Sequence, residues 1–245
     1  MHGVALALHT AIGAAALLSY WTAALARKGG RLHRGAGRVY LWGMAGILLS
    51  ALPLALAYFG EGQALTGVFF LYLMILVGTN LVQAPRAVRL KQDFAAYRSG
   101  AYPLIAWLLI GAGMATAAAG QILGSGRGPA LMAAFGLVGA FRGYNMLRLR
   151  RAAQPQPGWW LREHYMAMIG NGVATHIAFL SIGLVKLFPG GIGQYLVDLN
   201  LSWFGPLATG LAAIAWLNRR YRNRFAARRQ AVVSPLPALA ERGPG

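Results

Sequence analysis

The sequence predicts an all-α membrane protein: a polytopic bundle of seven transmembrane helices, with its N-terminus outside the cell and its C-terminus inside. Of the 245 residues, 57% are hydrophobic and only 11% are charged, and the mean hydropathy is +0.50. This composition is too apolar for a soluble domain. The apolar residues gather in stretches of about 20, the length that an α-helix needs to cross a bilayer.

Seven apolar stretches have this length. In chain order they cover residues 3–26, 38–59, 65–85, 102–123, 129–149, 164–187 and 199–217. Helices are required because a chain surrounded by lipid must satisfy its backbone hydrogen bonds within each segment. No basic region precedes the first stretch, so we expect a span there and not a cleavable signal peptide.

Local features support individual stretches. Pro53 lies inside the second and Pro85 ends the third, and both predict kinks. Gly120 and Gly124, near the end of the fourth, have the small-xxx-small spacing that lets helices approach closely. Aromatic residues around Trp160 precede the sixth and are typical of a membrane interface.

The basic residues predict the orientation. All of the 23 Lys and Arg residues except Arg127 and Lys186 lie on the first, third and fifth connections or after the seventh stretch. Short loops rich in Lys and Arg stay in the cytoplasm. The net charge of +18 follows this pattern, so it predicts no nucleic-acid partner. The expected partners are the lipid bilayer and, at residues 218–229, anionic lipids of the inner leaflet.

The chain is expected to form one transmembrane domain over residues 1–230. The remaining segment, 231–245, contains three prolines and predicts a disordered cytoplasmic tail. The chain has no cysteine, which excludes disulfides, iron–sulfur ligation and thiol chemistry.

Polar residues within the stretches recur at spacings that place them on one helix face. We expect them in the interior of the bundle, formed by the first, third and sixth stretches. The polar interior set is Tyr20, Asn80, Gln83, Glu163, Asn171 and Thr175. Two interpretations stay open: hydrogen bonding between helices, or a lining for a small solute or for protons. Glu163 is expected to pair with Arg162 or Arg38.

Histidines are the main chemical clue. Paired neutral imidazoles from different helices hold b-type haem, and haem iron is the only metal that this sequence suggests. His33 and His164 are expected near the inner surface, whereas His9 and His176 lie deeper. Two such pairs would carry electrons across the bilayer. One observation argues against two stacked haems: His164 and His176 are about 18 Å apart along the helix and roughly 120° apart around it.

Two sequence stretches resemble a bacterial family of integral membrane proteins known as domain of unknown function 2306. They are RLHRGAGRVY at residues 31–40, followed by Met44, and EHYMAM at 163–168, continuing to THIAFL at 175–180. The resemblance implies a helical bundle in the bacterial inner (cytoplasmic) membrane. It supplies no catalytic residues, because that family has no assigned activity.

The sequence lacks the residues that other known activities of seven-helix membrane proteins require. A retinal protein needs a lysine in its last helix, and the only lysines are Lys28, Lys91 and Lys186. Membrane hydrolases need clustered carboxylates or a metal site, and neither spacing appears. Three hypotheses remain: a b-haem electron-transfer protein, a small-solute or proton-coupled transporter, and a non-catalytic scaffold or accessory subunit for other membrane subunits.

Overall fold

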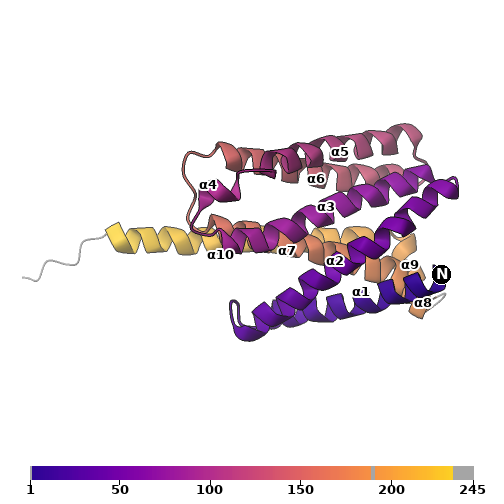
Figure 1. The fold of residues 1–245 in the computed structure, drawn as a ribbon, viewed down its shortest axis with the longest axis horizontal. Coiled ribbons are helices and arrows are strands. Elements are labelled where there is room, and N and C mark those ends of the chain that lie inside the picture. Colours follow the sequence, from indigo (N-terminus) through magenta and orange to yellow (C-terminus); the bar gives the residue numbers. More distant parts are fainter. Residues whose placement is uncertain (1, 189–190, 234–245) are drawn as a thin grey trace, which may run out of the picture.

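The computed structural model describes the backbone of residues 2–188 and 191–233, and the side chains of most residues between 7 and 223. Every regular element in these residues is helical. In chain order the elements are α1 (His2–Leu25), α2 (Arg31–Gly60), α3 (Ala64–Arg89), α4 (Phe94–Tyr97), α5 (Tyr102–Leu123), α6 (Gly128–Arg151), α7 (Trp159–Ala178), the π-helix η1 (Phe179–Gly183), α8 (Leu184–Leu187), α9 (Ile192–Asp198) and α10 (Leu201–Val233) (Figure 1).

The predicted all-α fold is confirmed. Five helical segments of the described chain are long and apolar enough to cross a membrane. They are Ala7–Leu25, Arg31–Gly60, Ala64–Arg89, Phe94–Leu123 and Gly128–Arg151, which correspond to the first five predicted stretches. Their length and composition are those of a membrane protein.

Three features differ from the sequence expectation. The short helices α4 and α9 were not predicted, and the sixth stretch is helical from Trp159 to Leu187 but passes through the π-helix η1. Single π-helical turns of this kind interrupt α-helices where one residue is inserted. Helix α10 continues to Val233, past the predicted domain boundary at residue 230. Residues 234–245 of the predicted tail lie outside the described residues.

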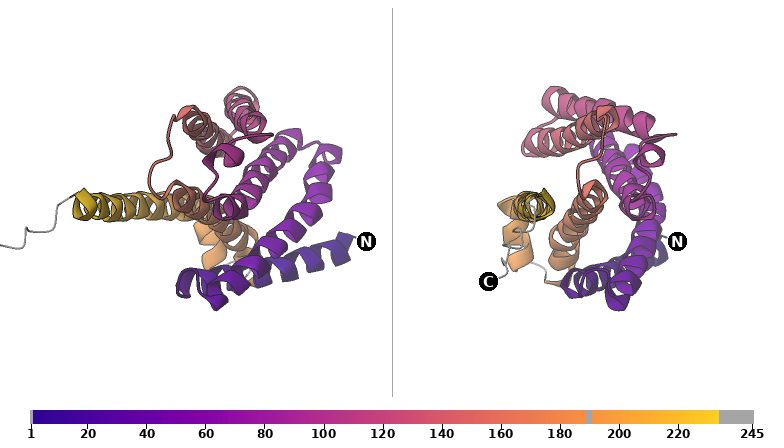
Figure 2. Two further views of the ribbon diagram at one scale, coloured as in Figure 1. Left: turned by 60° about the vertical axis from the view of Figure 1, so that its left-hand side comes forward. Right: turned by 90° about the vertical axis from the view of Figure 1, so that its left-hand side faces the viewer.

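Two helical hairpins flank a central pair of helices. Helices α3 and α7 pack against each other, the α1–α2 hairpin lies on one side of this pair, and the α5–α6 hairpin lies on the other (Figures 1 and 2). Helix α10 packs along α7. The central position of α3 and α7 brings their polar residues into the middle of the bundle.

The basic connections share one end of the molecule. The α1–α2 connection, α4, the α6–α7 connection and the free end of α10 all lie at the left in Figure 1. This end is called the basic end below. Helix α10 has 33 residues, or about 50 Å at 1.5 Å per residue. It therefore projects beyond the other helices at this end (Figure 1).

Helices α5 and α6 approach each other through glycines. A Cβ atom built on Gly113 would lie 2.4 Å from the carbonyl oxygen of Gly136, and one built on Gly143 would lie 2.4 Å from the carbonyl oxygen of Ala106. Backbone atoms cannot move aside as a side chain does. The hairpin therefore depends on small residues at this contact.

We expect Gly113→Ala to destabilise the protein by about 1–3 kcal/mol, because the added methyl group overlaps the backbone of α6. Thermal unfolding of the purified protein in detergent measures the effect. The matched control is Gly111→Ala in the same helix, where a Cβ atom meets nothing within 4 Å. Equal losses of stability in the two variants would contradict the close contact.

Candidate functional site

Two arginines hold the α3–α5 connection in place at the basic end. Arg86 donates to the carbonyl oxygens of Ala96 (Nη2, 2.6 Å) and Tyr97 (Nε, 3.2 Å). Arg98 reaches the end of α6 and donates through Nη1 to the carbonyl oxygen of Ala152 at 2.5 Å. The two arginines, which the sequence analysis used to predict the membrane orientation, thus also donate to carbonyl groups at helix ends that otherwise lack partners.

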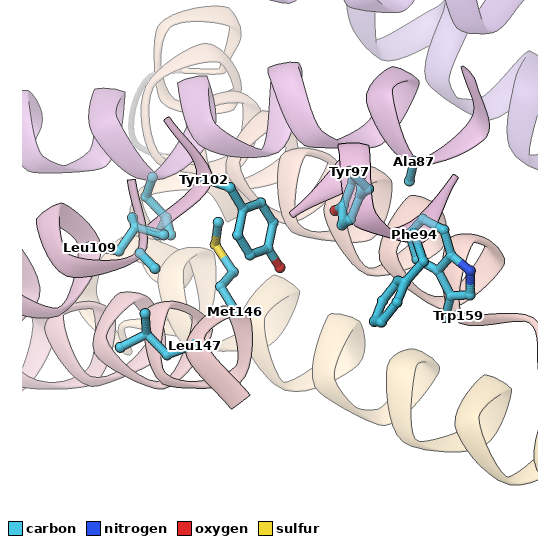
Figure 3. Close-up of a cluster of buried hydrophobic side chains, with 10 residues drawn as sticks. Ala87, Phe94, Tyr97, Tyr102, Leu109, Met146, Leu147 and Trp159 are labelled. Carbon is cyan, nitrogen blue, oxygen red and sulfur yellow. The ribbon is translucent and has the colours of Figure 1, made fainter. Parts of the chain in front are cut away.

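A cluster of aromatic side chains fills the space beneath this connection. Phe94 and Tyr97 of α4 pack on Trp159 at the start of α7, with ring centroids 5.0 and 4.8 Å apart (Figure 3). Tyr97 also lies beside Tyr102, at 5.3 Å. Met146 of α6 completes the cluster and is fully buried. The short helix α4 is therefore part of the core.

A buried ion pair joins α6 to α7 next to this cluster. Arg142 Nη2 lies 2.8 Å from Glu163 Oε2, and both side chains are only 8% exposed. The Tyr97 hydroxyl donates to the same carboxylate oxygen at 3.1 Å. The carboxylate thus has two donors, as a buried charge requires.

The expected partner of Glu163 was wrong. Glu163 pairs with Arg142, which the sequence analysis had assigned to a connection, whereas Arg162 and Arg38 are both exposed. Arg142 was counted with the basic connection although it lies within the predicted stretch 129–149, and in the structure it is buried more than two turns before the end of α6. The sequence did contain a feature that could have indicated the interior position of Arg142. Gly136, Gly139 and Gly143 have helical spacing, so they form a face of small residues beside this arginine.

The structure brings His33 and His164 together at the basic end. Their ring centroids are 6.4 Å apart and the ring planes differ by 74°. His33 Nδ1 lies 2.9 Å from the carbonyl oxygen of Ala23, and His164 Nδ1 lies 3.1 Å from that of Ala84. A carbonyl only accepts, so each Nδ1 carries the hydrogen. In the neutral rings both Nε2 atoms then keep their lone pairs.

The environment of His33 includes a cation and an open position. Lys28 Nζ donates to the carbonyl oxygen of Ala23 at 3.3 Å, and partial burial lowers the pKa of this lysine. Gly37 stands one turn after His33 on α2, and a Cβ atom built there meets nothing within 4 Å. The position one turn after His33 is therefore open for a further side-chain atom.

His9 and His176 lie at different levels of the bundle. His9 Nδ1 is hydrogen bonded to Ser50 Oγ at 2.8 Å. His176 instead lies beside Tyr20 and Trp21 of α1, with ring centroids 5.6 Å from each. Tyr20 is eleven residues after His9, or roughly 17 Å further along the helix. The expected pairing of His9 with His176 is therefore not found.

Both ring nitrogens of His176 already have partners. Nδ1 donates to the carbonyl oxygen of Gly172 at 2.7 Å. Nε2 accepts from the indole N–H of Trp21 at 3.0 Å. The lone pair that a metal would need is thus used in a hydrogen bond.

The expected polar interior is largely buried. Asn80, Gln83, Asn171 and Thr175 are at most 7% exposed, and they lie where α3 and α7 meet. Some make contacts that the sequence did not indicate: the Thr175 and Tyr40 hydroxyls are 2.9 Å apart. In contrast, Gln83 Oε1 and both side-chain amide atoms of Asn171 are buried without a hydrogen-bond partner among the described residues.

No group of three or more His, Cys, Asp or Glu side chains in the described residues could hold a metal ion. A pair of histidines can hold haem iron, which takes four further ligands from the macrocycle. No family model, curated protein or solved structure matches this chain.

Removing one partner of the ion pair should strongly destabilise the bundle. We expect Arg142→Met to cost about 3–5 kcal/mol, because the Glu163 carboxylate is left buried without a counter-charge. Adding Glu163→Gln should restore most of this loss, since the amide oxygen still accepts from Tyr97. Unfolding in detergent of the two single variants and the double variant measures the coupling.

The exposed Arg148, on the same helix, supplies the control. Arg148→Met should change stability by no more than about 0.5 kcal/mol. A similar result for Arg142→Met would show that the ion pair contributes nothing to the fold.

Proposed function

We propose that the chain crosses the membrane seven times, with α7–η1–α8 and α10 as the sixth and seventh spans. Helix α7 packs against α3, and α10 packs along α7 (Figure 2). Helical residues continue from Trp159 to Leu187, about 43 Å, which exceeds the roughly 30 Å of a bilayer core. The buried Asn171 and Thr175 lower the apolarity of this segment, and their burial keeps them away from lipid.

The basic end faces the cytoplasm in this proposal, with the N-terminus outside and the C-terminus inside. The gathering of the basic connections at one end supports it, because Lys-rich and Arg-rich loops are retained on the inner side. The protein then belongs in a bacterial inner membrane, and the projecting end of α10 lies on the side of the anionic lipid headgroups and the cytoplasm.

Single cysteines test this topology, because the chain has none of its own. We expect a membrane-impermeant maleimide to label Glu61→Cys and Ser125→Cys in intact cells. Arg27→Cys and Ser99→Cys should be labelled only after the membrane is opened. All four positions are exposed, so accessibility depends on the side of the membrane alone. Labelling of positions 27 and 61 from the same side would overturn the arrangement.

Within this bundle, His33 and His164 are proposed as axial ligands of one b-type haem in a membrane electron-transfer protein. The observation that carries the proposal is the 6.4 Å separation of their rings. Iron bound about 2 Å from each Nε2 would hold the centroids of two facing rings about 6 Å apart. Haem would supply the one-electron chemistry; the chain supplies the two imidazoles.

The hydrogen bonds around this pair also fit axial ligands. Metal-binding histidines usually donate the other ring N–H to a carbonyl, which fixes the orientation of the ring. His33 and His164 do so through Ala23 and Ala84. Exposed Arg34 lies one residue from His33 and suits a propionate carboxylate. A second haem has no such support, because the His176 nitrogens are engaged.

The packed centre of the bundle disfavours the transporter alternative. Ala16, Tyr40, Met44 and Val77 meet between α1, α2 and α3 and are at most 7% exposed. A solute path through this region would require these side chains to separate. The scaffold alternative is distinguished from the haem protein by the following experiment.

Protein expressed with abundant haem should show a Soret band that is lost in both His33→Ala and His164→Ala. His9→Ala and His176→Ala are the matched controls and should keep it, because neither residue contacts the His33–His164 pair. The absorbance is compared at equal amounts of folded protein, judged by size-exclusion chromatography. A wild-type protein without a Soret band would remove the haem proposal and leave the scaffold role.

A further inference from the structure

The ion pair leaves several buried donors of the same cluster without partners. Arg142 uses Nη2 for Glu163, but its Nε and Nη1 atoms are buried and unpaired among the described residues. The Tyr102 hydroxyl is also buried and unpaired, on a side chain only 2% exposed. Buried donors without an acceptor are costly, and those of a charged group most of all.

The charge around Tyr102 is unbalanced in the positive direction. Among the described residues, its hydroxyl interacts electrostatically with the guanidinium groups of Arg142, Arg86 and Arg98 and with one carboxylate, that of Glu163. Arg86 and Arg98 are only partly buried, donate to uncharged carbonyl groups, and form no ion pair among the described residues. A region with low polarity and excess positive charge attracts an anion.

We propose that Arg142 and Tyr102 bind a small monovalent anion of the size of chloride. The free guanidinium N–H groups and the phenol O–H would donate to it, and its charge would offset the excess of the arginines. The burial of both side chains selects a monatomic anion over a phosphate or a lipid headgroup. The site lies on the face of α7 that carries Glu163, so it does not depend on haem at His164.

Thermal unfolding of the purified full-length protein in detergent tests the site. Sodium chloride is titrated against sodium gluconate at constant ionic strength, because gluconate is too large for a buried site. A bound anion raises the unfolding temperature with a saturable dependence on chloride concentration. In Tyr102→Phe the midpoint of this dependence should rise about ten-fold, the effect of one lost hydrogen bond to a charge.

The design separates anion binding from simple folding effects. Tyr102→Phe removes a hydroxyl that has no hydrogen-bond partner among the described residues, so we expect this variant to fold. Tyr144→Phe on α6, where the side chain is 55% exposed, should respond to chloride as the wild type does. The proposal is overturned if chloride and gluconate give the same unfolding temperature. It is also overturned if Tyr102→Phe keeps the wild-type midpoint, the result expected when only water meets these donors.

Discussion

The structure depends on keeping polar side chains away from lipid. A polar group facing hydrocarbon has no water to bond with, so the helices that carry such groups must occupy the middle of the bundle. Helix α7 carries Glu163, His164, Asn171 and Thr175, and it contacts α1, α3 and α10. Helix α3 supplies Asn80 and Gln83 to the same contact. The two hairpins then cover this centre with surfaces made largely of apolar and small residues.

Small residues set how closely the outer layer can approach. On the α5–α6 side the contact is backbone to backbone at Gly113 and Gly136. Close approach at this hairpin brings Arg142 within reach of Glu163, and α4 then covers the pair from the basic end. Glycine packing between α5 and α6 and the charge pair between α6 and α7 thus act on two faces of the same helix.

Much of this arrangement follows from the sequence, because span length and loop charge are local properties. The first five long helices cover the first five apolar stretches, although α2 begins earlier and α10 ends later than predicted, and the burial of Asn80, Gln83 and Asn171 follows from helical spacing. Pairing between helices is not local. The partner of Glu163 and the separation of His9 from His176 depend on helix rotation and depth, which a single sequence does not encode in its spacing. The proximity of His33 and His164 could be predicted from the sequence, since both residues were expected near the inner surface.

Glu163 and His164 are consecutive, yet they face different parts of the bundle. One residue along an α-helix turns the side chain by about 100°. Glu163 therefore meets α6 and α4, while His164 meets α3 and α2. The ion pair fixes the rotation of α7 at its first turn, and the same rotation directs the His164 ring toward His33. Through Glu163, Arg142 of α6 thus helps to orient His164, although it contacts a different face of α7.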